Sequence, residues 1–100
     1  MLTGWNYQFY ALVVNYSSNN CTSVDLTNPL APVAGATVTV GANPFGVAIS
    51  PDGKSALVVN FGSGTCTSVD LTNPLAPVAG GTVTVGTTPY SLGPSMIYSR

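Results

Sequence analysis

The chain has 100 residues, of which 45% are hydrophobic and only 5% are charged, with a formal net charge of −1. This composition suits one small domain with an apolar core and excludes a disordered chain. Two cationic side chains and no His exclude a basic surface for nucleic acid, as well as imidazole-based catalysis or metal ligation.

Residues 1–8 form a leader that precedes the first repeated segment. No basic region followed by an apolar stretch is present, so the sequence predicts no secretory signal peptide. The apolar run at 10–14 is too short to span a membrane. Trp5 and Tyr7 lie outside the repeat and are candidates for an exposed adhesive patch.

An internal repeat dominates the rest of the chain. The sequence Ala-Leu-Val-Val-Asn occurs at 11–15 and again at 56–60, an offset of 45 residues from Ala11 to Ala56. A longer block, Cys-Thr-Ser-Val-Asp-Leu-Thr-Asn-Pro-Leu-Ala-Pro-Val-Ala-Gly, reads identically at 21–35 and 66–80. A period of about 40 to 50 residues indicates propeller blades or helical arrays.

The local pattern within each repeat favours β-strands. Thr and Val alternate at 37–40 and at 82–85, which predicts half-buried strands. The Leu-Val-Val runs at 12–14 and 57–59 are apolar and β-branched, and we expect these strands to be buried on both faces. No segment has a capped helical period, so we predict an all-β chain of antiparallel, four-stranded, propeller-type blades that form an incomplete propeller.

Turn signals separate the expected strands. Pro51-Asp52-Gly53-Lys54 has the residues of a hairpin turn, and further turns are expected at 62–64 and at the two Asn-Pro segments. The expected strands lie near 9–16, 20–26, 33–40, 44–50, 55–61, 65–71, 77–85 and 89–93. The predicted division is a non-repeat leader (1–8), a first blade of three strands (9–42), a complete second blade (43–86), and a first strand of a third blade with a degenerate tail (87–100).

The search for chemistry yields no catalytic, cofactor-binding or metal site. Asp25 and Asp70 are repeat equivalents and are expected to cap the turns that follow them, and Asp52 is a turn residue. Cys21 and Cys66 lie one repeat apart, beyond the Cα separation of ~7 Å that a disulfide tolerates. We expect two free thiols that act as small core residues, because no cation nearby in the sequence lowers their pKa.

Aromatic residues recur at equivalent positions of the repeat. Phe45 is equivalent to Tyr90, and Tyr16 is equivalent to Phe61. Such equivalence favours aromatic side chains that pack between blades over a ligand platform.

The repeated residues resemble the YVTN-type β-propeller repeat. The run from Asn43 to Lys54 carries the resemblance, together with Leu-Val-Val-Asn at 57–60, which stands where that family has Tyr-Val-Thr-Asn. The Asp-Leu-Thr-Asn-Pro-Leu-Ala-Pro-Val segment is similar to a related propeller repeat of surface proteins. The resemblance covers residues 9–90 and implies blade architecture, in propellers of about seven blades. It also implies a periplasmic, secreted or cell-surface protein.

Two functions from different classes follow from the resemblance. The first is a non-catalytic structural or interaction scaffold. The alternative is a fragment of a propeller enzyme, lactonase-like or reductase-associated, whose catalytic residues lie on missing blades. The expected partners are other blades or copies of the chain itself, with no nucleic acid and no membrane insertion. Both ends depart from the repeat pattern, so the chain is either a fragment or closes by association, with Pro89–Gly93 of one copy pairing with Leu12–Asn15 of the next.

Overall fold

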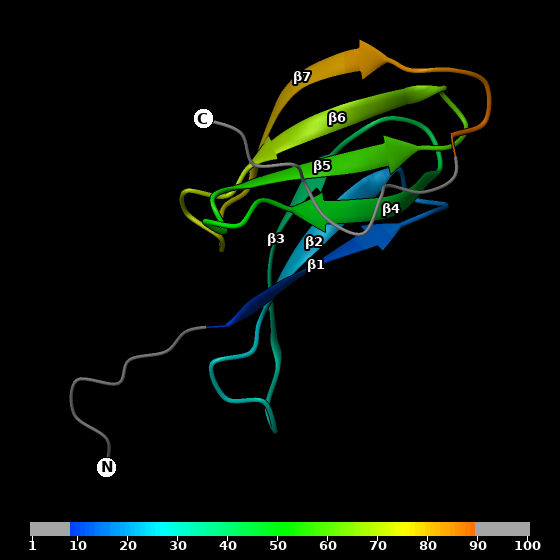
Figure 1. Ribbon diagram of the computed structural model, residues 1–100. Helices are drawn as coiled ribbons and strands as arrows, with labels where there is room; N and C mark the ends of the chain where they lie inside the picture. The colour runs from blue at the N-terminus through cyan, green and yellow to red at the C-terminus, as the bar shows by residue number, and fades with distance from the viewer. Residues whose placement is uncertain (1–8, 90–100) are drawn as a thin grey trace.

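The computed structural model describes residues 9–89 and consists of β-strands joined by turns (Figure 1). No helix occurs within this range. In chain order the strands are β1 (Tyr10–Asn15), β2 (Asn20–Asp25), β3 (Val33–Thr39), β4 (Pro44–Ile49), β5 (Ser55–Asn60), β6 (Thr65–Asp70) and β7 (Val78–Thr84).

The strands form two antiparallel sheets, which we call the first and the second sheet. The first has three strands in the order β1-β2-β3, and the second has four in the order β4-β5-β6-β7. Every neighbour in a sheet is also the neighbour in sequence, as in a propeller blade. The fold of residues 9–89 is therefore all-β, with propeller-type blades and no closed barrel within that range. These strands lie within one or two residues of the predicted positions, whereas most of the strand expected near 89–93 lies outside the described residues.

The turns form as their residue types predict. Gly53 has a φ of 75°, and its N–H donates to the carbonyl of Ser50 at 2.9 Å. The turn that joins β5 to β6 ends on Gly64 with a φ of 69°, and its repeat equivalent, Asn19, has a φ of 62°. These left-handed positions carry Gly or Asn, the residues that tolerate them best.

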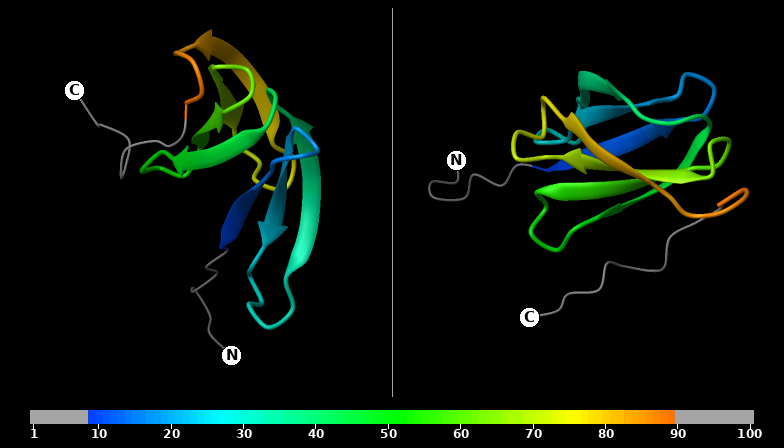
Figure 2. Two further views of the ribbon diagram at one scale, coloured as in Figure 1. Left: turned by 90° about the vertical axis from the view of Figure 1, so that its right-hand side faces the viewer. Right: turned by 90° about the horizontal axis from the view of Figure 1, so that it is seen from above.

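The hydrophobic core lies between the two sheets, which pack face to face (Figure 2). The sheets come nearest at β1 and β4. Side chains alternate along each strand, so only one face of each sheet enters the core. The buried and partly buried core residues are Leu12, Val14, Cys21, Val38 and Val40 of the first sheet and its following connector, and Val47, Ala56, Val58, Val69 and Leu71 of the second sheet and its following loop.

Burial on both faces was predicted for the Leu-Val-Val runs and holds for only one of them. Val58 and Val59 are both buried, but Val13 of the first run is 45% exposed. The half-buried pattern fails likewise at Val83, which is 57% exposed, although its equivalent Val38 is 8% exposed. The prediction was wrong at Val13 and Val83 because no described sheet packs against the faces on which they lie.

Replacement of Val58 by Ala tests the core. It removes two methyl groups from a fully buried site and should lower the free energy of unfolding by about 2 kcal/mol, including a cavity contribution. The matched control is Val13→Ala, the same change at the equivalent exposed position, with an expected loss below about 1 kcal/mol. Urea unfolding at low protein concentration measures both, and equal losses would contradict the described packing.

Candidate functional site

Each of the three carboxylates of the chain caps a turn of its own sheet. Asp25 Oδ1 accepts the backbone N–H of Thr27 at 2.8 Å, and Asp70 Oδ1 accepts that of Thr72 at 2.8 Å. Asp52 Oδ1 accepts the Ser50 hydroxyl at 2.6 Å and the backbone N–H of Lys54 at 2.9 Å. The predicted capping roles are confirmed, and each carboxylate is engaged within two residues of itself.

Hydrogen bonding lowers the pKa of all three carboxyl groups. The Thr27 side chain and then its backbone N–H lower the pKa of Asp25, and Thr72 acts in the same way on Asp70. The Ser50 hydroxyl is the largest cause of the lowered pKa of Asp52, followed by the Lys54 backbone N–H. A lowered pKa makes these groups poor proton donors or acceptors near neutral pH.

The two cysteines are free, as predicted, and both are buried. Burial raises the pKa of Cys21 to about 11 and also raises the pKa of Cys66. A thiol with a raised pKa is a poor nucleophile and a poor metal ligand near neutral pH. Residues 9–89 contain no group of three or more Cys, Asp, Glu or His side chains that could hold a metal ion.

Asn60 is the buried polar side chain with the most hydrogen bonds among the described residues, and its role was not predicted from the sequence. The residue has no exposed surface. Its Nδ2 donates to Thr65 Oγ1 at 3.0 Å and to Thr67 Oγ1 at 2.8 Å, and its Oδ1 accepts the backbone N–H of Gly41 at 3.1 Å. Gly41 belongs to the connector between the two sheets, residues 40–43, so the hydrogen bond from Gly41 to Asn60 joins that connector to β5.

Asn15, at the equivalent position of the first repeat, makes two side-chain hydrogen bonds where Asn60 makes three. Its Nδ2 donates to Asn20 Oδ1 at 2.8 Å and to Thr22 Oγ1 at 3.0 Å. No donor among the described residues reaches its Oδ1. Recurrence of Asn after both Leu-Val-Val runs was the signal that could have identified Asn60.

Further hydrogen bonds join the two sheets. Asn43 lies in the connector with a φ of 53°, and its N–H donates to Asn19 Oδ1 at 2.9 Å. Its carbonyl accepts the N–H of Phe61 at 2.9 Å. At the other end of the sheets, Ala36 N–H donates to the carbonyl of Leu75 at 3.2 Å. The contact between the two sheets, which we call the junction, thus combines an apolar centre with hydrogen bonds at both ends.

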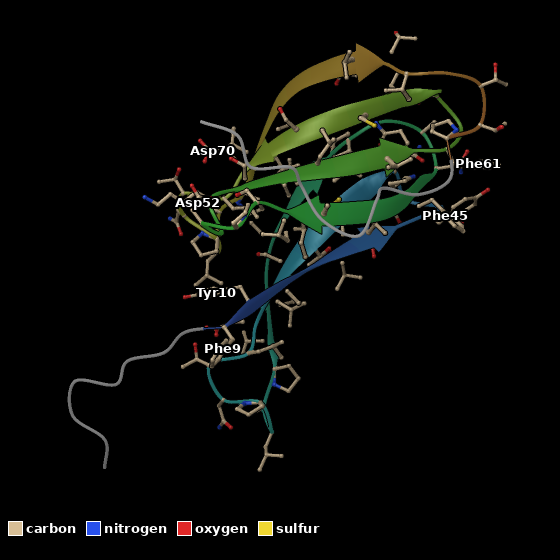
Figure 3. The ribbon with its side chains drawn as sticks, viewed as in Figure 1. Phe9, Tyr10, Phe45, Asp52, Phe61 and Asp70 are labelled. Carbon is tan, nitrogen blue, oxygen red and sulfur yellow. The ribbon has the colours of Figure 1, made fainter. Side chains whose placement is uncertain are left out.

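Three aromatic side chains, Tyr16, Phe45 and Phe61, cluster at the end of the junction that carries the connector. The Tyr16 and Phe45 rings are 6.3 Å apart in an edge-on arrangement, and the Phe45 and Phe61 rings are 6.1 Å apart. Figure 3 shows Phe45 and Phe61 close together at this end, far from Asp52 and Tyr10. The contact between Tyr16 and Phe45 joins the two sheets, and the contact between Phe45 and Phe61 lies within the second sheet. Trp5, Tyr7 and Tyr90 lie outside the described residues.

A cleft of about 380 Å³ opens at the opposite end of the junction. Its walls include Tyr10, Leu12, Ile49, Asp52 and Leu71. The described wall is mainly apolar, and its carboxylate already accepts two hydrogen bonds within its own turn. The cleft therefore presents a surface for apolar packing.

The sequence matches no protein-family model and no curated protein. Two solved structures are similar to the chain. Hydrazine synthase of Kuenenia stuttgartiensis has a TM-score of 0.69 and 25% identity over 80% of this chain. A functionally unknown protein from Desulfotomaculum acetoxidans has a TM-score of 0.71 and 18% identity over 89% of this chain.

The chain covers 21% of the hydrazine synthase chain and 32% of the Desulfotomaculum chain. These likenesses agree with a β-propeller-like segment. No helix among the described residues is long and apolar enough to cross a membrane.

Replacement of Asn60 by Ala tests the hydrogen bond that joins the connector to the second sheet. The change leaves Gly41 N–H without its buried acceptor, so the free energy of unfolding should fall by about 1–3 kcal/mol. Asn15→Ala is the matched control and should cost less, because its Oδ1 accepts no bond from the described residues. Urea unfolding at low protein concentration measures both, and an equal or larger loss for Asn15→Ala would refute the role assigned to Asn60.

Acid should destabilise the chain through its capping carboxylates. Their pKa values in the folded state lie below the ordinary value of 3.8, so the unfolded chain takes up protons first as the pH falls. Their stabilising contribution is present above pH 3.8 and is lost as the pH falls through the folded-state values. Denaturant unfolding across this range should show the loss, and Asp70→Asn should reduce its pH dependence. An unchanged dependence in Asp70→Asn would contradict the capping role.

Proposed function

We propose that the chain is a non-catalytic segment of YVTN-type β-propeller repeats that serves as a structural and interaction scaffold. The observation that supports this most directly is the use of every carboxylate as a turn cap within its own sheet. Buried thiols with raised pKa values point the same way. The repeat resemblance adds a periplasmic, secreted or cell-surface setting to the proposal.

The scaffold acts through its sheet faces. Each face presents β-branched and small apolar side chains in a fixed register, and one face of each sheet is already used in the junction. The other faces are apolar as well, because Val13, Val83 and Val85 are exposed on them. Apolar patches of this kind are typical of surfaces that bind other protein elements.

A second candidate, a segment of a propeller enzyme, is favoured by the 25% identity to hydrazine synthase. In that case the catalytic groups lie on further blades and these two sheets support them. The coding sequence on either side distinguishes the two candidates. A continuing frame with His and acidic residues in the loops of one rim favours the enzyme.

A zinc titration tests the absence of a metal-based activity in this segment. Because the thiols are buried and a repeat apart, calorimetry should detect no binding in the micromolar range, and a panel of lactones should remain unhydrolysed. Micromolar zinc binding that Cys66→Ser abolishes would overturn the proposal. Cys66→Val is the control for packing, because it keeps an apolar side chain of similar size at the same position.

A further inference from the structure

We propose that the outer face of the second sheet binds the outer face of the first sheet of a second copy of this chain, head to tail. The outer face of the first sheet carries Ala11, Val13 and Val24. The outer face of the second sheet carries Leu57, Val83 and, just beyond β7, Val85. The proposal rests on the scaffold function and names its partner.

The internal repeat makes these two outer faces complementary. The residues on the core face of the first sheet recur on the outer face of the second sheet. Likewise, the residues on the core face of the second sheet recur on the outer face of the first. With the exception of Val47, every core residue has an identical residue 45 positions away on the face of the other sheet that points away from this core. The pairs are Leu12 and Leu57, Val14 and Val59, Cys21 and Cys66, Val38 and Val83, Val40 and Val85, Ala11 and Ala56, Val13 and Val58, Val24 and Val69, and Leu26 and Leu71.

Exposure shows which of these residues lack a cover. Val58 is 0% exposed in the junction, whereas Val13 is 45% exposed on the outer face. Val38 is 8% exposed and Val83 is 57% exposed. Val59 and Cys66, nearer the centre of the second sheet, are buried, so the uncovered part of that face is the side that carries β7.

The donor and the acceptor of one hydrogen bond in the junction have repeat equivalents on the outer faces, and these equivalents are not bonded to each other. In the junction, Gly41 N–H donates to Asn60 Oδ1 at 3.1 Å. On the outer faces, Asn15 Oδ1 accepts no bond from residues 9–89, and the N–H of Gly86, the equivalent of Gly41, makes only a long contact of 3.4 Å with the carbonyl of Gly64. Gly86 N–H of one copy is therefore the donor, and Asn15 Oδ1 of the next copy the acceptor, of a hydrogen bond equivalent to that between Gly41 and Asn60.

A loop supplies a second matching contact. Leu75 lies against Gly35, and its carbonyl accepts the N–H of Ala36. Its equivalent, Leu30, is 94% exposed, compared with 40% for Leu75. The position that corresponds to Ala36 on the outer face is Gly81, which has open space where a side chain would lie. Leu30 of one copy thus fits over Gly81 of its neighbour.

These contacts define a heterologous interface, because the two surfaces differ. Such contacts either close into a ring or continue as a filament. Each copy brings two sheets, so a ring of roughly three or four copies falls within the size range of natural propellers.

Complementation between two blocked variants tests the proposal. Val13→Lys blocks only the outer face of the first sheet, and Val83→Lys blocks only that of the second, since Lys resists burial. Each variant alone should be monomeric, and an equimolar mixture should form a complex of about two chains, because one unblocked face of each kind remains. Sedimentation velocity over a dilution series should show concentration-dependent oligomers for the unmodified chain.

Matched controls separate loss of the interface from loss of the fold. Val78→Lys lies on the same strand as Val83 but should leave the oligomers unchanged: Val78 is 60% exposed, and its equivalent Val33 remains 61% exposed on the covered face, so this position lies outside the contact. Leu30→Lys changes an exposed loop, cannot disturb the core, and should weaken the oligomers.

Three outcomes overturn the proposal. They are a monomeric unmodified chain at high concentration, oligomers that persist in Val13→Lys or in Val83→Lys alone, and two monomeric variants that do not combine. A folded monomer that binds no zinc would reject the second copy as partner while leaving the scaffold function in place. Zinc binding would reject the scaffold function itself.

Discussion

The structure depends on the contact between two sheet faces that carry different residues. A sheet of three or four strands buries an apolar face only when another element covers it. Here the covering element is the next repeat, and the contact also determines a polar bond: Asn60 is tolerated without exposed surface because the connector places Gly41 N–H against its oxygen. Apolar packing and polar satisfaction are therefore coupled, and each repeat needs its neighbour in order to be complete.

This coupling explains which parts of the fold the sequence predicts. Strand positions, turn types and the capping by Asp25, Asp52 and Asp70 depend on residues close together in the chain, and they were predicted correctly. Burial was not, because Val13 and Val58 occupy the same Ala-Leu-Val-Val-Asn context and are 45% and 0% exposed. Identical local sequence cannot encode that difference, which arises from whether another sheet lies against the strand.

The candidate site divides in the same way. Aromatic packing at Tyr16, Phe45 and Phe61 was predictable from repeat equivalence alone. The hydrogen bond from Gly41 N–H to Asn60 Oδ1 was not predicted, because Gly41 precedes Asn60 by 19 residues and lies in a connector without a motif of its own. The internal repeat of 45 residues leads to blade architecture without identifying this contact.

The shape of the junction limits how further units can be added. The two sheets come nearest at β1 and β4, with a smaller second approach between β3 and β7. A further unit that repeats this junction is related to its neighbour by the same rotation and translation. When equal rotations close, the last outer face meets the first, and the ring leaves neither outer face exposed. A filament would keep one such face at each end, on a chain whose net charge of −1 provides little repulsion against unspecific contact.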